Sequence, residues 1–429
     1  MRLTWAQPED LLPHELVQSA AEGKDVAAAR ARWIAAGGDP VPAVSGAGPA
    51  APGLRALARE LLDSLDAPAP EPEPVLPAAP SLPRGSRGRE LDAWTGRAAG
   101  CLLGKPVEKI PREGIEEILR ATGRWPLDRW FTAVGLPSEV AGRWPWNRRS
   151  APTSLEENID GMPEDDDLNY PMLALSLVEE RGRGFTTEDV AQLWLDNLPA
   201  GRVFTAERAA YRNLLDARAV PETATYRNPF REWIGALIRA DVFGWICPGD
   251  VPAAARLAWA DARLSHTRNG VYGAMWAAGL ASAAMVCDTV DEVLDAATAA
   301  IPASSDLAEA VHFGRSAASD GDVASGLDRL HAAYGHLHWV HVLNNAATIA
   351  YALAKGGGEF GPSVAIAVTA GWDTDSAAAT VGGVVGALSG LDEYWSKPLD
   401  GRIATSLPGG ERRIADLAAR TAALAEAGR

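Results

Sequence analysis

Two acidic clusters that lie far apart in the chain carry the residue types needed to hold divalent cations. The first, residues 163–170, reads PEDDDLNY and places four consecutive carboxylates directly before an apolar helical pattern. Neighbouring carboxylates repel one another, so each resists ionisation unless a cation or a helix N-terminus compensates its charge. The first cluster is therefore either an acidic cap for the helix that begins near Leu168 or one half of a metal site.

The second cluster, residues 371–376, reads GWDTDS and favours the metal-site alternative. Asp373 and Asp375 are two positions apart and point to the same side of an extended loop, and Ser376 adds a neutral oxygen. An Asp-x-Asp-Ser sequence also occurs as a simple helix N-cap, so this motif alone leaves both alternatives open. Because hard cations prefer oxygen ligands, the two clusters together predict a site for such ions. Two ions roughly 3.5–4 Å apart hold diol oxygens and polarise a leaving group or water.

A second set of potential ligands consists of four histidines within a short stretch, His331, His336, His338 and His341. No cysteine is close to them, and their spacing lacks a clear carboxylate partner, which disfavours zinc. The oxygen-rich clusters suit magnesium or manganese better. Asn344 and Asn345 follow the histidines, and we expect them to cap or orient the next helix, as groups behind the metal ligands.

The composition limits the classes of function. With 40 basic and 56 acidic residues the chain carries a formal charge of −16, which argues against a uniformly basic face for nucleic acid. The three cysteines have no paired spacing, so neither a disulfide framework nor a cysteine zinc site is expected. The N-terminus lacks a signal-peptide pattern, and the most membrane-like stretch, residues 271–286, is too short and too rich in Ala and Gly. We therefore predict a cytoplasmic protein without a membrane or nucleic-acid partner; the sequence carries no signal for an oligomeric state.

The elements that must position the clusters are helices. Residues 1–66 carry helical patterns and are predicted to form a small N-terminal appendage, with leucines on one helical face at Leu54, Leu57, Leu61, Leu62 and Leu65. Residues 67–83 are rich in Pro and Ala and predict an extended linker. Residues 84–429 are the predicted catalytic domain, an all-α, multi-helix body. Its clearest helical patterns span 168–180, 187–198, 205–217, 253–264, 271–286, 344–356, 376–388 and 411–428.

Six segments resemble, in the same order, the motifs of the ADP-ribosylglycohydrolase family, which includes the dinitrogenase reductase activating glycohydrolases. They are GRAAGCLLGKPVE (96–108), PEDDDLNY (163–170), IGALIRADVFG (234–244), DARLSHTRNGVYG (261–273), HWVHVLNNA (338–346) and GWDTDSAAATVGG (371–383). The resemblance covers residues 90 to about 395 and leaves residues 1–83 outside. It implies an all-α fold with two divalent cations, Mg²⁺ or Mn²⁺, that engage the ribose hydroxyls of ADP-ribose.

The resemblance also assigns candidate site residues. The first ligand group corresponds to Glu164, Asp165 and Asp166. The second ligand group corresponds to Asp373, Asp375 and Ser376. Both groups combine several carboxylates within a few residues, as a site for divalent cations requires.

Glu108 falls where the family has an acidic residue near the metals, and we predict that it is the general base. From charge patterning alone, Glu108 is equally a surface residue paired with Lys105 or Lys109. The resemblance further implies substrate contacts by Gly235, through close backbone approach, and by the residues Arg239 and His266. Outside the resemblance, a helix with an outward-facing arginine and a structural histidine are the alternatives for the last two.

The chain departs from the family pattern at two positions. Glu164 stands where the family commonly has threonine, which adds charge and length to the first ligand group. Cys101 stands where the family has aspartate in Gly-Asp-x-x-Gly, which removes one acid near the site. We expect Cys101 to be packed rather than reactive. Both departures bear on which substrate the site accepts.

The leading hypothesis is a metal-dependent hydrolase that cleaves a glycosidic bond to an ADP-ribosyl or related ribosyl group. Its substrate is either an ADP-ribosylated protein or a small ribosyl or NAD-derived metabolite. The first alternative is a non-catalytic protein that binds ADP-ribose or serves a structural role; buried like charges argue against it, because a scaffold does not need them. The second alternative is a helical interaction module built on residues 1–83.

Overall fold

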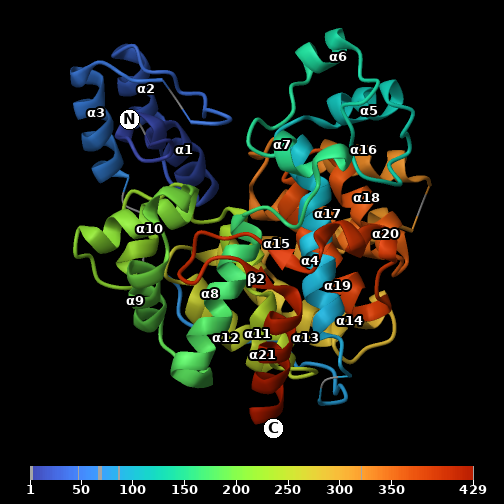
Figure 1. The fold of residues 1–429 in the computed structure, drawn as a ribbon. Helices are drawn as coiled ribbons and strands as arrows, with labels where there is room; N and C mark the ends of the chain where they lie inside the picture. The colour runs from blue at the N-terminus through green and yellow to red at the C-terminus, as the bar shows by residue number, and fades with distance from the viewer. Residues whose placement is uncertain (1–2, 47, 66–69, 86, 320, 429) are drawn as a thin grey trace.

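The computed structural model describes residues 3–46, 48–65, 70–85, 87–319 and 321–428. The predicted all-α architecture is confirmed: within these ranges the chain consists of helices, connecting loops and one two-stranded ribbon (Figure 1). None of the described helices is long and apolar enough to cross a lipid bilayer.

The helices of the first half of the chain follow one another in the order α1 (Pro8–Ala21), α2 (Ala27–Ala35), α3 (Pro52–Ser64), α4 (Glu90–Gly104), α5 (Arg112–Ala121), α6 (Ser138–Arg143), α7 (Ala151–Ser154), α8 (Asp166–Arg181), α9 (Thr187–Asn197) and α10 (Thr205–Leu215). The second half contains α11 (Asp241–Trp245), α12 (Val251–Ala262), α13 (Arg268–Ala284), α14 (Val290–Thr298), α15 (Asp306–Ala317), α16 (Val323–Tyr334), α17 (Val342–Gly356), α18 (Phe360–Thr369), α19 (Thr374–Ser389), α20 (Glu393–Ser396) and α21 (Ile414–Ala427).

Short 3₁₀ helices join several of these elements: η1 (Lys105–Val107), η2 (Glu156–Asn158), η3 (Gly182–Gly184), η4 (Ala200–Arg202), η5 (Glu222–Ala224), η6 (Ile234–Arg239) and η7 (Lys397–Leu399). The two strands, β1 (Arg402–Ile403) and β2 (Arg412–Arg413), pair in antiparallel orientation. Ile403 also forms a bridge to Met162, which places this ribbon directly beside the start of the first acidic cluster.

The centre of the body is the crossing of α4 and α19, which run side by side in Figure 1. Small residues allow the two backbones to touch: a Cβ added at Gly96 would lie 2.2 Å from the carbonyl oxygen of Gly382, and one at Gly100 would lie 2.0 Å from that of Ala378. At the end of the crossing, the Thr374 hydroxyl donates to the Gly104 carbonyl over 2.9 Å. The start of α19 is therefore fixed against the end of α4.

The N-terminal helices pack on the body. Helix α1 is almost entirely buried on one side, and Leu11, Leu12 and Leu16 belong to the same core cluster as the central helices. The predicted boundary at residue 66 lies outside the described residues, and so do residues 67–69 of the predicted linker. Residues 70–83 form neither helix nor strand and follow the surface of the body, where the Tyr272 hydroxyl donates to Glu71 over 2.6 Å. The division into appendage, linker and body remains a prediction.

Substitution of Gly100 by alanine is expected to destabilise the fold strongly, because the new methyl group would meet the backbone of α19 rather than a movable side chain. We expect a loss of about 3 kcal/mol or more in the free energy of unfolding, above the usual cost of overpacking. Gly53→Ala in α3 is the matched control, since nothing lies within 4 Å of that position. Urea unfolding measures both, and equal midpoints would contradict the close helix crossing.

Candidate metal centre

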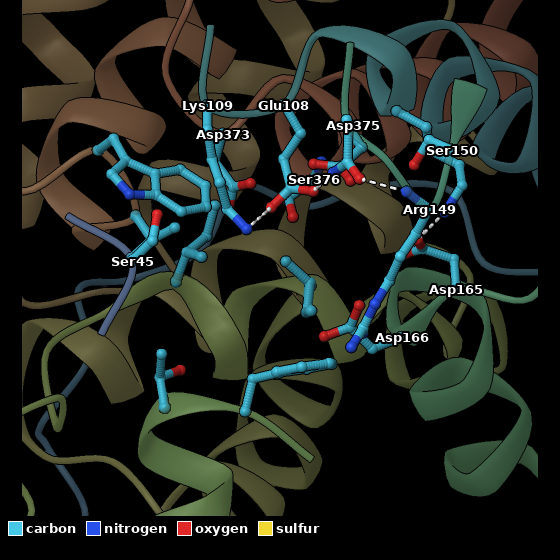
Figure 2. Close-up of a pocket in the computed structure, with 18 of the residues that line it drawn as sticks. Ser45, Glu108, Lys109, Arg149, Ser150, Asp165, Asp166, Asp373, Asp375 and Ser376 are labelled. Carbon is cyan, nitrogen blue, oxygen red and sulfur yellow. Dashed lines mark hydrogen bonds and ion pairs between the residues drawn. The ribbon is translucent and has the colours of Figure 1, made fainter. Parts of the chain in front are cut away.

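Three chain segments meet at one cavity of roughly 1130 Å³. The segment after α4 supplies Lys105 and Glu108, the segment before and at the start of α8 supplies Glu164, Asp165 and Asp166, and the start of α19 supplies Asp373, Asp375 and Ser376. Figure 2 shows that the side chains of Glu108 and of the four labelled aspartates point toward a common space. Both predicted ligand groups, which are distant in the sequence, therefore lie together in the structure.

Asp165 acts both as a helix cap and as an ion-pair partner. Its Oδ1 accepts a hydrogen bond from the Asp167 backbone amide over 2.9 Å, so the cap interpretation of the first cluster holds for this oxygen. Its Oδ2 pairs with the buried ammonium group of Lys105. Burial raises the pKa of the Asp165 carboxyl, but the Lys105 charge more than offsets it and holds this pKa below its ordinary value.

Asp167, to which sequence analysis assigned no role, connects the two clusters. The Ser376 hydroxyl donates to Asp167 Oδ2 over 3.3 Å, and the Cys101 thiol lies 3.7 Å from the same oxygen. Asp167 Oδ1 is buried without a hydrogen-bond partner, although Arg97 Nη2 lies 3.5 Å away. One potential ligand atom each from Cys101, Asp165 and Asp167 lies within 4.8 Å of the others. The sequence shows the run of four carboxylates, but the direction of the Asp167 side chain depends on the fold.

Asp166, Asp373 and Asp375 lie close to one another, and the nearby positive charge does not offset their mutual repulsion. Burial, and then the charges of Asp165, Asp375 and Glu108, raise the pKa of Asp166 well above its ordinary value. Burial, together with Glu108 and Asp165, raises the pKa of Asp375 to about 7. Asp373 follows the same pattern, with burial first and then Asp375 and Glu108 as the causes of a raised pKa. The cavity therefore concentrates negative charge that an added cation would stabilise.

The second cluster does not cap its helix through the side chain of its first aspartate. Gly371 has φ +79°, a conformation that lets the chain turn into α19 against the Arg112 backbone. Asp373 occupies the N-cap position of α19, but its side chain accepts no hydrogen bond from the helix. Its backbone amide instead donates to Asn345 Oδ1 over 3.3 Å. Asn345 thus orients the loop that carries Asp373, in line with its expected position behind the ligands.

Glu108 pairs with Lys109, as one of the two sequence interpretations expected, and also lines the cavity. One of its oxygens accepts a hydrogen bond from the Asn147 amide, and the other lies 3.2 Å from the Lys109 ammonium group. The same carboxylate lines the cavity and contributes to the raised pKa of Asp373 and Asp375. Two protein donors therefore hold Glu108 beside the acidic clusters.

Glu164 lines the cavity but is directed toward protein donors. Its carboxylate accepts hydrogen bonds from the Asn169 amide over 3.1 Å and from the Ser406 backbone amide over 2.9 Å, and Arg202 Nη2 lies 3.0 Å away. These partners come from α8, the end of η4 and the loop after β1. Four protein donors hold the Glu164 carboxylate, so we leave Glu164 out of the ligand set proposed below. Asp165 stays in the set because its Oδ2 pairs with a single ammonium group, which a cation can replace.

Arg239 and His266 lie behind the cavity wall rather than in it. The Arg239 guanidinium is buried, donates to Glu207 Oε1 over 2.7 Å and pairs with Asp261. His266 is fully buried; its Nδ1 lies 2.8 Å from the Ser265 hydroxyl oxygen, and burial lowers its pKa well below the ordinary value. In this structure neither side chain is available for the direct substrate contact expected from sequence.

Gly235 lines the cavity, and its lack of a side chain leaves room for the carboxylate of Glu207. A Cβ at this position would lie 2.2 Å from a carboxylate oxygen of Glu207. Glu207 itself lines the cavity, and burial raises its pKa to about 7 despite the lowering effect of Arg239. Glu207 has no local sequence signal, because it occurs singly within an ordinary amphipathic helix.

The histidine stretch forms no metal group among the described residues. His331 stacks on Trp372 with ring centroids 4.1 Å apart, and His338 stacks on Trp233 at 4.2 Å. His341 caps α17 by accepting a hydrogen bond from the Leu343 amide. The histidines thus have separate structural roles.

The residues present fit hard divalent cations. The donor set consists of carboxylate and hydroxyl oxygens, which Mg²⁺ and Mn²⁺ prefer. Asp167 Oδ1, a buried acceptor without a hydrogen bond, lies directly behind this set, since the other oxygen of Asp167 accepts from Ser376. The N-termini of α8 and α19 both open toward the cavity and help to keep their carboxylates ionised when a cation is bound.

Three comparisons with known proteins gave the following results. A family model described as ADP-ribosylglycohydrolase matches residues 83–428. A solved structure titled "ADP-ribosylglycohydrolase-related protein complex" is similar with a TM-score of 0.47 and 19% sequence identity, over 80% of this chain and 98% of that one. A search of curated proteins found no match.

Asp375→Asn is expected to change how stability depends on pH when divalent ions are removed. Because the pKa of Asp375 in the folded protein is about 7, above its unfolded value, the folded state binds this proton more tightly. The associated stability is present at low pH and is lost as the pH rises through about 7. The Tm of the wild-type protein in chelator should therefore fall from about pH 5 to about pH 8 more than that of the variant.

Mg²⁺ at the higher pH should raise the wild-type Tm and leave that of Asp375→Asn almost unchanged. Asp392→Asn, at an exposed position, is the control and should follow the wild type. A wild-type protein that gains stability with pH in chelator would contradict the charge repulsion described above.

Lys105→Met is expected to destabilise the metal-free protein, because it leaves the buried charge of Asp165 without its partner. Removing one member of a buried pair costs roughly 3–5 kcal/mol. Mg²⁺ should restore part of this loss, since a cation replaces the missing ammonium group. Lys109→Met removes an exposed pair worth about 1 kcal/mol or less and serves as control. Calorimetry with and without Mg²⁺ measures the difference; similar Tm values for both variants would argue against this role of Lys105.

Proposed function

Because the chain belongs to the ADP-ribosylglycohydrolase family, we propose that it is a metal-dependent hydrolase that cleaves the glycosidic bond of an ADP-ribosyl or related ribosyl substrate. The observation that carries this proposal is the convergence of two sequence-distant acidic clusters on one cavity. A protein that only binds or scaffolds has no need for a buried concentration of repelling carboxylates.

The proposed ligand set holds two divalent cations, Mg²⁺ or Mn²⁺, and draws on Asp165, Asp166, Asp373, Asp375 and Ser376. When bound, such ions bind vicinal ribose hydroxyls and stabilise developing negative charge on oxygen. The protein fixes the ligands on helix ends, which keeps their carboxylates in place before substrate arrives.

Glu108 is the proposed general base. Its carboxylate accepts a proton from a water molecule whose oxygen adds to the anomeric carbon of the ribose, while the bond from that carbon to the leaving nitrogen or oxygen breaks. The leaving nitrogen or oxygen takes up a proton, and Glu108 releases the proton that it accepted, so the overall hydrolysis is balanced. Asn147 and Lys109 orient Glu108 for this step.

Cationic side chains in the same cavity suit the diphosphate of an ADP-ribosyl group. Lys109, Arg148, Arg149 and Arg202 all line the cavity, and guanidinium groups bind phosphate oxygens through charge-assisted hydrogen bonds. With the ribose at the acidic clusters, the diphosphate would contact these cationic side chains within the same cavity. The substrate is then either an ADP-ribosylated protein or a small ribosyl metabolite derived from NAD.

Glu108→Gln is expected to lower kcat by about 10²- to 10⁴-fold, the usual contribution of a general base, with little change in ADP-ribose affinity. Asp373→Ala and Asp375→Ala should abolish turnover while the fold is retained. Glu113→Gln, an exposed neighbour in α5, is the matched control. Chromatographic release of ADP-ribose from ADP-ribosyl-arginine and from small N-ribosides, with Mg²⁺ or Mn²⁺, measures turnover.

These assays also separate the two substrate classes and the non-catalytic alternative. Binding of ADP-ribose without release from either substrate would favour a non-catalytic binding protein. Full activity in both aspartate variants would contradict the proposed site.

A further inference from the structure

The N-terminal segment, residues 3–46, forms part of the wall of the acidic cavity. Thr4, Trp5 and Ser45 line the cavity, although the family match begins only at residue 83. Figure 1 shows the N-terminal helices beside α10, and Figure 2 places Ser45 across the cavity from Asp166. The segment thus adds a wall that the family region alone does not supply.

Buried ionic contacts hold this segment in place. The Arg231 guanidinium is fully buried and binds one carboxylate of α1 and the carboxylate of the residue that follows α1. Arg231 Nη1 lies 2.9 Å from Glu15 Oε2, and Arg231 Nε lies 2.7 Å from Glu22 Oε1. The Gln18 amide donates to Glu232 over 2.8 Å. Loss of one partner would leave a buried charge uncompensated, so these contacts oppose separation of α1 from the body.

Trp5 joins the segment to an aromatic cluster of the body. Its ring lies edge-on to Phe230, with centroids 5.6 Å apart, and edge-on to Trp233 at 5.9 Å. His14 of α1 completes the contact at 5.4 Å from Trp5, and burial lowers its pKa to about 3. The wall is therefore aromatic and uncharged, in contrast to the acidic end of the cavity.

Trp339 is the body residue whose ring the segment positions at the cavity. Its indole N–H donates to the Val44 carbonyl over 3.0 Å, and Lys109 Nζ lies 5.4 Å from the ring centroid. Ser45, next in the chain, brings a hydroxyl that both donates and accepts hydrogen bonds. An indole ring beside a small polar side chain is an arrangement that stacks an aromatic base and contacts its edge.

We infer that the N-terminal segment and Trp339 together form a subsite for the nucleobase end of the substrate, and that this subsite selects nucleotide-linked ribosyl groups over ribosyl groups without a base. The inference rests on the proposed function, because the acidic end of the cavity must hold the ribose. Lys109 Nζ lies 3.2 Å from Glu108 Oε1 and 5.4 Å from the centroid of the Trp339 ring, so it connects the acidic end of the cavity to this wall. With the ribose at the acids and the phosphates beside Lys109, the base would lie against the wall of Trp5, Ser45 and Trp339.

The test compares two ligands in three variants of the full-length chain. Ser45→Trp fills the proposed subsite, Ser45→Ala leaves its volume open, and Val41→Trp adds the same ring at an exposed position of the same segment that does not line the cavity. Isothermal titration with Mg²⁺ measures binding of ADP-ribose and of ribose 5-phosphate. Ser45→Trp should weaken ADP-ribose binding by about tenfold or more, the size of a lost stacking contact, and leave ribose 5-phosphate unchanged.

A second measurement covers the case in which the new tryptophan turns toward solvent. Hydrogen–deuterium exchange of the wild-type protein should slow at the amides of residues 44–46 with ADP-ribose but not with ribose 5-phosphate. Unchanged exchange there, or equal protection by both ligands, would overturn the inference while the proposed function stands. If the wild-type protein bound neither ligand, the proposed function would fail and the inference with it.

Discussion

Repulsion between buried carboxylates is the interaction on which the rest of this structure depends. Asp166, Asp373 and Asp375 line one cavity, and Asp167 is buried next to them in contact with Ser376. Burial and mutual repulsion raise the pKa of each of the four. Lys105 neutralises only Asp165 directly. Such an arrangement is unfavourable on its own. Under the proposed function, bound divalent cations would make it favourable, and metal affinity would be coupled to folding stability at this site.

The scaffold keeps these charges together by joining helix ends through very close backbone contacts. The glycine-lined crossing of α4 and α19 sets Lys105 and Glu108 against the loop that carries Asp373. Arg97, fully buried on α4, donates to the Asp167 carbonyl over 2.8 Å and pairs with Asp241 at 2.6 Å. One arginine therefore ties the start of α8 to the start of α11.

The sequence was most informative where a pattern is local. The periodicity of 187–198 and 344–356 predicted helices at nearly their observed positions. The two acidic clusters, each before a helical pattern, predicted two segments that the structure brings to one cavity. The sequence was silent on contacts between distant single residues. Two examples are Glu207, which packs behind Gly235, and Arg231, which pairs with a glutamate of α1 and with the glutamate that follows it. Neither leaves a local signal, because a single Glu or Arg is ordinary in a helical protein. Arg239 and His266 are also single residues, so the sequence could not show that their side chains lie behind the cavity wall rather than in it.

Anomalous diffraction from crystals soaked in Mn²⁺ tests the central claim most directly. The account predicts manganese peaks inside the cavity, at coordinating distance from Asp373 and Asp375 on one side and from carboxylates at the start of α8 on the other. An empty cavity at saturating Mn²⁺, or manganese bound only at acidic groups elsewhere on the surface, would contradict it.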